Sequence, residues 1–140
     1  MEKVRAIIAS DKDRVGLRSK LKEWLENDNL EVILLSRVKI FRIRREIKSK
    51  NPTLVFITVS LYTSEEFKEL CGFIKKLRKH LPETIIIVNT PRLSEYNKGK
   101  LFELGADGWI NDTVDYPLLS RAVEAIVKKK EIPHFSKTII

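Results

Sequence analysis

Five polar residues stand within two positions of the end of an apolar run, and these are the residues whose types and positions could do chemistry. They are Ser10, Asp11, Thr58, Thr90 and Asp112. If the apolar runs are parallel strands, their carboxyl ends meet at one edge of a sheet, where open α/β folds bind ligands. Carboxylates there could bind a divalent cation. The simpler interpretation of the acids is helix capping and solvation, because Lys12 separates Asp11 from Asp13 and the third strand offers only a hydroxyl.

Other site chemistries find little support in the sequence. No glycine-rich loop follows the first apolar run, so the dinucleotide fingerprint and the P-loop are both absent. His80 and His134 lie outside the group of strand-end residues, which argues against a Ser/His/Asp arrangement. A nucleotide or flavin at the strand ends would therefore have to bind without a phosphate loop.

The segment Pro52 to Ser60 is the expected centre of the fold. Leu54 to Ile57 are four consecutive apolar residues, and Val59 follows after Thr58. A strand with one solvated face would alternate apolar and polar residues, whereas a continuous run rich in β-branched and aromatic types indicates a strand covered on both faces. Thr58, near its carboxyl end, is then the residue closest to any site.

The rest of the chain alternates expected strands and helices. The strands are Val4 to Ala9, Leu30 to Leu35, the central segment, Thr84 to Val88 and Gly108 to Ile110. The expected helices are Leu17 to Leu25, Arg37 to Lys50, Thr63 to His80, Ser94 to Leu104, and a last one that starts at Asp115 and ends with Lys130. This order predicts a (βα)5 fold, a doubly wound five-stranded parallel sheet with helices on both faces.

Local signals place the ends of these helices. Asn51-Pro52 ends the second helix, because a residue before proline avoids the helical region. Thr63-Ser-Glu-Glu has the form of a capping box and opens the third helix. Cys71 falls on the inner face of that helix, so we expect a small core residue rather than a reactive thiol. Gly105 closes the fourth helix.

Bulk composition indicates a single domain in a reducing compartment. The chain has 140 residues, 43% of them apolar, and a single cysteine that excludes an intrachain disulfide. It contains no apolar run long enough to span a bilayer, and its start lacks the apolar core of a signal peptide. We expect a cytoplasmic protein with one domain over residues 1–130 and a tail over residues 131–140.

The net charge of +8 favours anionic partners, with a solvated surface as the simpler interpretation. The charge is concentrated in the expected helix Arg37 to Lys50. Its candidate nucleic-acid contacts are Arg37, Lys39, Arg42, Arg44, Arg45 and Lys48. Nucleic-acid binding through this helix is therefore an alternative function, and steep salt dependence would be its signature.

Several segments together resemble the receiver domain of two-component response regulators, which has a flavodoxin-like three-layer fold. The matching segments are Val4-Arg-Ala-Ile-Ile-Ala-Ser-Asp, Pro52-Thr-Leu-Val-Phe-Ile-Thr, Ile85-Ile-Ile-Val-Asn-Thr and Gly105-Ala-Asp-Gly-Trp-Ile. The last is the most specific. From Gly105 to Pro133 the chain is most similar to receivers that precede a DNA-binding helix-turn-helix. The resemblance covers about residues 3–130 and implies strand order 2-1-3-4-5.

The resemblance also implies roles for the strand-end residues. Thr58 occupies the position of the family's phosphoacceptor aspartate, and Ser10 with Asp11 the positions of the two acids that hold Mg²⁺. Thr90 keeps the hydroxyl that contacts the phosphoryl group. Asp112 replaces the lysine that does so. Trp109 keeps the aromatic residue that changes rotamer on activation. Without phosphorylation neither residue needs a switching role, and the preferred interpretation is a loop hydrogen bond for Thr90 and a partly buried ring for Trp109.

These departures predict that aspartyl phosphorylation is absent. A threonine hydroxyl is a poor nucleophile without a base, and one carboxylate is a thin ligand set for Mg²⁺. We therefore expect a pseudo-receiver that is not an enzyme and uses no cofactor. The cofactor that the resemblance would imply is Mg²⁺, and we do not expect it to bind. It would bind a partner protein or dimerise through its fourth helix, fifth strand and fifth helix. That face is expected to present Tyr96, Lys100, Trp109, Arg121 and Lys128.

Overall fold

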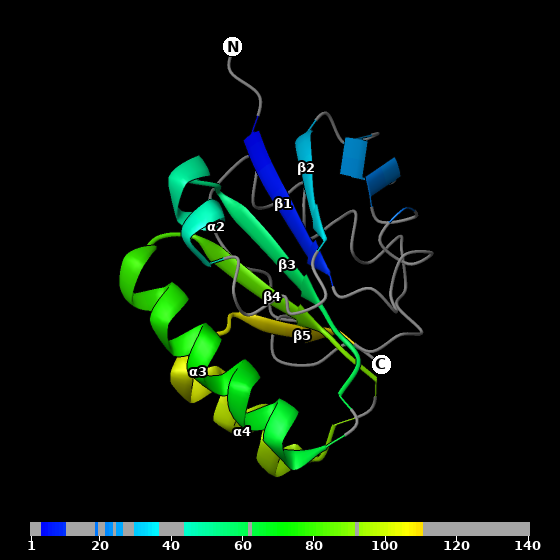
Figure 1. The fold of residues 1–140 in the computed structure, drawn as a ribbon, viewed down its shortest axis with the longest axis vertical. Helices are drawn as coiled ribbons and strands as arrows, with labels where there is room; N and C mark the ends of the chain where they lie inside the picture. The colour runs from blue at the N-terminus through cyan, green and yellow to red at the C-terminus, as the bar shows by residue number, and fades with distance from the viewer. Residues whose placement is uncertain are drawn as a thin grey trace.

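The fold is a five-stranded parallel sheet in the order β2-β1-β3-β4-β5 (Figure 1). The computed structural model describes residues 4–10, 19, 22–23, 25–26, 30–36, 44–61, 63–91 and 93–110. The strands are β1 (Val4–Ser10), β2 (Leu30–Ser36), β3 (Leu54–Thr58), β4 (Ile85–Asn89) and β5 (Gly108–Ile110). All four strand pairings are parallel, and the predicted order 2-1-3-4-5 is confirmed.

The central strand β3 is buried on both faces, as its continuous apolar run predicts. Every residue from Leu54 to Thr58 is fully buried, and in the neighbouring β1 the same holds from Ala6 to Ser10. Successive side chains of a strand point to opposite faces, so burial of every position requires cover on both sides. The sheet therefore holds its strand tips inside the protein rather than at its surface.

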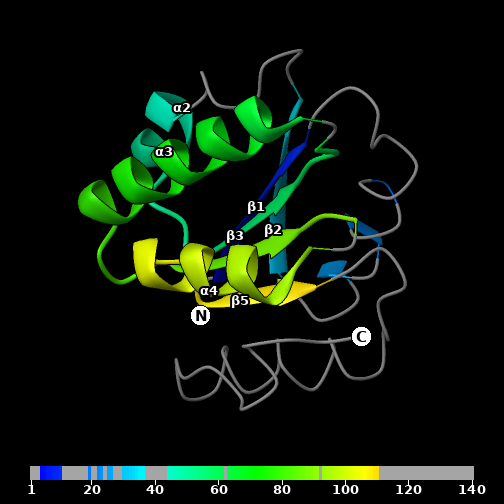
Figure 2. The same ribbon diagram turned by 90° about the horizontal axis from the view of Figure 1, so that it is seen from below.

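Three helices pack side by side along one face of the sheet (Figure 2). They are α2 (Arg44–Lys50), α3 (Ser64–His80) and α4 (Glu95–Leu104). The predicted capping box at the start of α3 is confirmed, because the Thr63 hydroxyl accepts a hydrogen bond from the Glu66 amide at 3.1 Å. The inner face of α3 buries Leu70, Cys71, Phe73, Ile74 and Leu77, which confirms Cys71 as a core residue.

Several element boundaries differ from the predicted ones by a residue or two at polar positions. β1, β2 and β4 each continue through one more residue, to Ser10, Ser36 and Asn89. The central strand is shorter than the segment Pro52 to Ser60 and starts at Leu54. The extensions arise because Ser10 pairs in register with both Ser36 and Thr58, and Thr58 with Asn89. The sheet ladder thus includes the polar tips that composition alone assigns to loops.

The helix predicted over Arg37 to Lys50 is described from Arg44 onward, and residues 37–43 lie outside the described part. Its end is as predicted: Asn51 adopts a left-handed conformation with φ of 44°, and its amide donates to the Lys48 carbonyl at 3.1 Å. Between β1 and β2 the described residues 22–23 and 25–26 are helical, and Leu25 is fully buried. The predicted helix from Asp115 to Lys130 and the tail at residues 131–140 lie outside the described residues.

The Gly105-Ala-Asp-Gly turn is held by Arg78 of α3. The Arg78 guanidinium donates to the Gly105 carbonyl at 2.8 and 3.0 Å and to the Asp107 carboxylate at 2.6 Å. Asp107 also accepts the Ile86 amide at 2.8 Å. Gly105 has φ of +121°, and an added Cβ would lie 2.7 Å from the Arg78 Cγ. The turn needs glycine at position 105 for both reasons. Because β5 starts directly after this turn, the turn also sets the position of Trp109.

No helix within the described ranges is both long enough and apolar enough to cross a membrane.

Candidate functional site

Four polar side chains gather at the carboxyl edge of the sheet and are buried there. Ser10, Thr58 and Asn89 end β1, β3 and β4, and Thr90 follows directly. Ser10 is opposite Thr58 in the sheet register, and Thr58 is opposite Asn89. Three of the four are fully buried and Asn89 is nearly so. The strand-end cluster expected from the sequence thus exists for Ser10, Thr58 and Thr90, but it lies inside the protein.

Thr58, the residue expected at the phosphoacceptor position, takes part in a hydrogen-bonded row that crosses three strands. Its hydroxyl donates to the Asn89 side-chain oxygen at 3.0 Å. The Asn89 side-chain amide in turn donates to the Ile110 carbonyl at 3.0 Å. The Asn89 carbonyl accepts the Val59 amide, also at 3.0 Å. Because buried polar groups must be paired, this row gives Thr58 a structural role that an aspartate nucleophile would not have.

Asn89 is a member of this row that sequence reasoning missed. The segment Asn89-Thr90-Pro91-Arg92 reads as a loop, yet Asn89 is the last residue of β4 and is 3% exposed. An amide can donate and accept at once, so it can join a hydroxyl on one side to a carbonyl on the other. The available signal was a polar residue that directly ends the apolar run Ile85-Ile-Ile-Val.

Ser10 differs from Thr58 in that its hydroxyl oxygen has no hydrogen-bond partner among the described residues, although it is fully buried. Asp11, the second residue of the expected acidic pair, lies outside the described residues, and so does Asp112. The described strand tips therefore contribute hydroxyls and one amide, whereas Mg²⁺ favours carboxylate oxygens. By themselves the described tips do not form a Mg²⁺ site. Among the described residues no three His, Cys, Asp or Glu side chains are grouped for a metal.

Thr90 and Trp109 form a second buried polar pair beside the row. The Trp109 ring nitrogen Nε1 donates to the Thr90 hydroxyl at 2.8 Å, and that hydroxyl donates to the Pro91 carbonyl at 2.7 Å. Thr90 thus makes the loop hydrogen bond expected of it. The prediction that Trp109 is presented on the surface is wrong, because its side chain is 2% exposed. The indole ring is large and apolar, and it packs into the core with its N–H satisfied.

Lys98 covers this pair from α4, and sequence reasoning did not single it out. The Lys98 ammonium nitrogen lies 4.4 Å from the centroid of the Trp109 ring and 2.9 Å from the Glu95 carboxylate. The residue is only 8% exposed, which is unusual for a lysine. A cation over an indole face is stabilised by the ring quadrupole. The spacing of Glu95 and Lys98 on one helix face was the one available signal.

The described part of this edge can bind, orient and pack, but it lacks the groups for phosphoryl chemistry. Activating a hydroxyl nucleophile requires an adjacent base, whereas the Thr58 hydroxyl donates to an amide oxygen, that of Asn89. Lys98, the buried cation beside Trp109, is engaged with the Trp109 ring and the Glu95 carboxylate. The edge therefore reads as a closed, hydrogen-bonded end of the sheet.

The described candidate nucleic-acid contacts lie on α2, which leads into the amino end of β3. Arg44, Arg45 and Lys48 are on α2, with Arg45 and Lys48 exposed and Arg44 half-buried. Arg37, Lys39 and Arg42 lie outside the described residues. Burial of Ile47 between these charged residues confirms that α2 is amphipathic and directs its cations outward.

Burial raises the pKa of the Cys71 thiol above its ordinary value, against a smaller opposing effect of the Lys100 charge. A raised pKa keeps the thiol protonated at neutral pH, and the thiolate is the reactive form. Cys71 therefore adds no chemistry to the strand-end cluster.

Comparison with solved structures shows that the chain has the receiver fold. It matches the isolated REC domain of RcsB from Salmonella enterica serovar Typhimurium at 18% identity and a TM-score of 0.73, covering 95% of both chains. It matches the signal receiver domain of the putative response regulator NarL from Mycobacterium tuberculosis at 17% identity and 0.72, covering 92% of this chain and 99% of that one.

A LuxR-family two-component response regulator from Aurantimonas sp. SI85-9A1 gives 19% identity and a TM-score of 0.69, with 91% of this chain and 86% of that one covered. No protein-family model and no curated protein matches the sequence. At these identities the likeness extends to the fold: the same parallel sheet in the same order.

Proposed function

We propose that the chain is a signalling module with a receiver fold that works without aspartyl phosphorylation. It binds a partner protein or a second copy of itself, and it is not an enzyme. The receiver fold supports the signalling role, since the solved structures it resembles are response regulators. We further propose that it acts in the cytoplasm, as one domain over residues 1–130 followed by a tail, and that it needs no cofactor.

The observation that supports this proposal best is the buried row from Thr58 through Asn89 to Ile110. Aspartyl phosphorylation needs a carboxylate that a phosphodonor can reach. The residue at that position is a fully buried threonine whose hydroxyl donates to Asn89 at 3.0 Å. Attack by this hydroxyl would require breaking the row and exposing the strand tip.

A phosphodonor experiment tests this part of the proposal. The protein is incubated with acetyl phosphate and Mg²⁺, or with beryllofluoride and Mg²⁺, and followed by intact mass and by tryptophan fluorescence. We expect no phosphoryl adduct and no Mg²⁺-dependent change in fluorescence. A stoichiometric, hydroxylamine-sensitive adduct would show an acyl phosphate and overturn the proposal.

The surface proposed for protein contact is the outer side of α4. Tyr96 is 76% exposed, and among the described residues it is the large hydrophobic side chain that stands out from the surface. Lys100 is exposed on the same helix. Tyrosine is enriched at interfaces because one ring buries a large area at a small cost in side-chain entropy. Trp109 is withdrawn from this surface into the core, and Arg121 and Lys128 lie outside the described residues.

Self-association through α4 is tested by sedimentation velocity over a range of protein concentrations. If a dimer forms, Tyr96→Ala should weaken it by about tenfold or more, since interface tyrosines often contribute 1–2 kcal/mol or more. Lys75→Ala, at an exposed position of α3, is the matched control and should change nothing. A dimer that Tyr96→Ala and Lys75→Ala leave equally intact would place the contact elsewhere.

Nucleic-acid binding is a second candidate, favoured by the outward cations of α2. Arg45 and Lys48 are exposed, and the whole chain carries a net charge of +8. Binding of this type weakens steeply with salt, because phosphate contacts release counterions. Filter binding of a DNA duplex at two salt concentrations tests it, with the double variant Arg45→Gln/Lys48→Gln expected to lower the salt slope by about two. No retention at low salt would remove this candidate.

A further inference from the structure

The exposed face of α3 separates negative charge from positive charge along the helix. Glu65 and Glu69 are exposed in its first half, where Lys68 is paired with Glu65 at 3.7 Å. The last two turns contain no acidic residue. Three exposed cations stand there without an ion pair among the described residues: Lys75, Lys76 and Lys79. A face that is only solvated usually intersperses both signs, so this separation needs another explanation.

Helix geometry brings these three lysines into one patch. Lys75 and Lys79 are four residues apart and Lys76 and Lys79 three, so their Cβ atoms lie about 5–6 Å apart on the same side of α3. Like charges at these spacings destabilise a helix. The helix dipole favours cations in the last turn, which accounts for Lys79 but not for Lys75 and Lys76 further back. Nothing within α3 therefore explains why all three are lysines.

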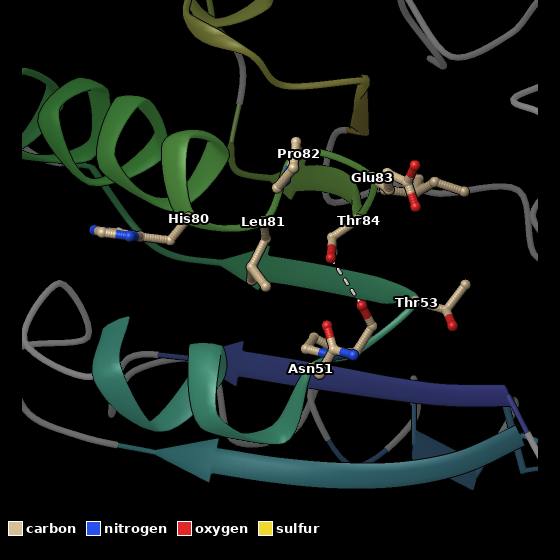
Figure 3. Close-up of a pocket in the computed structure, with 9 residues that line it drawn as sticks. Asn51, Thr53, His80, Leu81, Pro82, Glu83 and Thr84 are labelled. Carbon is tan, nitrogen blue, oxygen red and sulfur yellow. Dashed lines mark hydrogen bonds between the residues drawn. The ribbon is translucent and has the colours of Figure 1, made fainter.

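The end of α2 lies next to the end of α3. Figure 1 and Figure 2 both show α2 beside the carboxyl-terminal part of α3. The turns that follow the two helices line one pocket of about 430 Å³ (Figure 3). The Thr84 hydroxyl donates to the Pro52 carbonyl at 2.8 Å, the contact drawn as a dashed line in Figure 3. The Ile85 amide donates to the Thr53 carbonyl at 2.9 Å. These two hydrogen bonds hold the helix ends together.

α2 adds two exposed cations at this end of the molecule, Arg45 and Lys48. They are three residues apart and therefore lie on one side of the helix. Neither has an ion pair within the described ranges. The acidic residue of α2 is Glu46, which is half-buried, and Glu83 is exposed in the turn after α3. Positive charge therefore dominates the basic surface, which consists of Arg45, Lys48, Lys75, Lys76 and Lys79.

From this arrangement we propose that the basic surface binds the phosphate backbone of double-stranded nucleic acid without reading its sequence. The proposal rests on the second candidate function, nucleic-acid binding through α2. It adds the last two turns of α3 to the contact and names the form of nucleic acid that binds. A duplex complements this surface because it carries one negative charge about every 1.7 Å along its axis.

The residue types of the basic surface favour a duplex backbone over other nucleic-acid contacts. All three exposed cations of the α3 patch are lysines, which bind phosphate as point charges, whereas sequence is read mostly by arginine and amide side chains that form paired hydrogen bonds with base edges. Single strands are bound through aromatic side chains on which bases stack. Among the described residues the large hydrophobic side chain that is exposed is Tyr96, which lies in the first turn of α4 and outside this surface.

The experiment measures fluorescence anisotropy of the full chain with two short DNA duplexes of unrelated sequence and with one of their single strands, over a range of salt concentrations. We expect equal affinity for the two duplexes and weaker binding of the single strand. If each cation of the basic surface neutralises one phosphate, the plot of log K against log salt should have a slope of about −4 to −5.

Paired variants test whether the α3 patch takes part. Lys75→Gln/Lys76→Gln should reduce the steepness of the salt slope by about two, because two phosphate contacts are lost. Lys68→Gln/Lys100→Gln is the matched control: it removes the same charge from exposed positions in the first half of α3 and on α4, outside the basic surface. The control should keep the slope and the affinity of the parent protein.

Equal loss of binding in the two paired variants would show that affinity follows net charge alone and would overturn the proposal. Preference for one duplex sequence, tighter binding of the single strand, or displacement of the duplex by polyglutamate at equal charge would overturn it too, the last by assigning the surface to an acidic protein. If Arg45→Gln/Lys48→Gln weakens binding and Lys75→Gln/Lys76→Gln does not, this proposal fails while nucleic-acid binding through α2 stands. Absence of duplex binding at low salt removes both. A phosphodonor adduct would refute the proposed signalling function and leave the basic surface untouched.

Discussion

Replacement of Thr58 by valine tests whether the hydroxyl at the end of β3 stabilises the folded protein. Valine has nearly the same shape, so the change removes the hydroxyl with little effect on packing. The loss is the 3.0 Å hydrogen bond to the Asn89 side-chain oxygen, at a position with no solvent exposure. Water cannot replace this donor without opening the sheet edge.

The expected magnitude follows from that burial. A typical hydrogen bond contributes about 1 kcal/mol net, and a buried acceptor deprived of its donor costs about 1–3 kcal/mol. Thr58→Val should therefore lower the free energy of unfolding by about 1–3 kcal/mol. With a urea m-value of about 1–2 kcal/mol/M for a domain of this size, the midpoint should fall by about 1 M.

Urea unfolding followed by circular dichroism measures this difference, provided that m is unchanged between the variants. Thr58→Ser is the matched control, because it keeps the hydroxyl and removes one methyl group, a loss of about 1 kcal/mol. The reasoning is refuted if Thr58→Val is as stable as the parent protein. In that case the hydrogen bond from Thr58 to Asn89 would contribute nothing measurable to the free energy of unfolding.

Three further predictions concern the neighbouring structure. Gly105→Ala should lower the free energy of unfolding by about 1–3 kcal/mol, because φ is +121° and the new Cβ would lie 2.7 Å from the Arg78 side chain. Gly99→Ala, at a helix position with no atom within 4 Å of the new Cβ, should raise it by about 0.5–1 kcal/mol. Thermal melts that rank the two variants in the opposite order would contradict the role of the Gly105 turn. Trp109→Phe should cost about 1–3 kcal/mol by removing the Nε1 donor, measured by urea unfolding; an unchanged midpoint would mean that this bond contributes nothing. The Cys71 thiol should react slowly with a disulfide reagent at pH 8 and fast in urea, because burial raises its pKa in the native state; equal rates in both would place it at the surface.

The fold was predictable because its signals are local and agree with one another. The apolar run Leu54 to Ile57 indicates a strand buried on both faces, and the structure buries all four residues. The capping box at Thr63 and the Asn51-Pro52 boundary depend on neighbouring residues, and both helix ends lie where they predict. Alternation of such segments leaves few topologies, since parallel crossovers share one handedness.

The position of the candidate site was predictable from the sequence, but the burial and hydrogen-bond partners of its residues were not. The sequence brings Ser10, Thr58 and Thr90 to one edge, and the register places Ser10 beside Thr58 as expected. It does not reveal that Asn89 joins Thr58 to Ile110, because that contact spans residues 31 positions apart. Nor does it reveal that Lys98 is buried over Trp109, because burial of a lysine depends on a partner from another element. The expected exposure of Trp109 failed for the same reason.

The sequence by itself determined the five-stranded parallel sheet, the end of α2, the start of α3 and the presence of a threonine rather than an aspartate at the end of β3. These features depend on residue type and on spacing over a few residues, so the signals for them are local in the sequence. Only the tertiary structure decided that Thr58 is sealed into a hydrogen-bonded row and that the Trp109 ring nitrogen turns inward to Thr90. Each of these depends on side chains from different elements meeting in a buried or crowded place, where burial sets the energy of a polar or charged group.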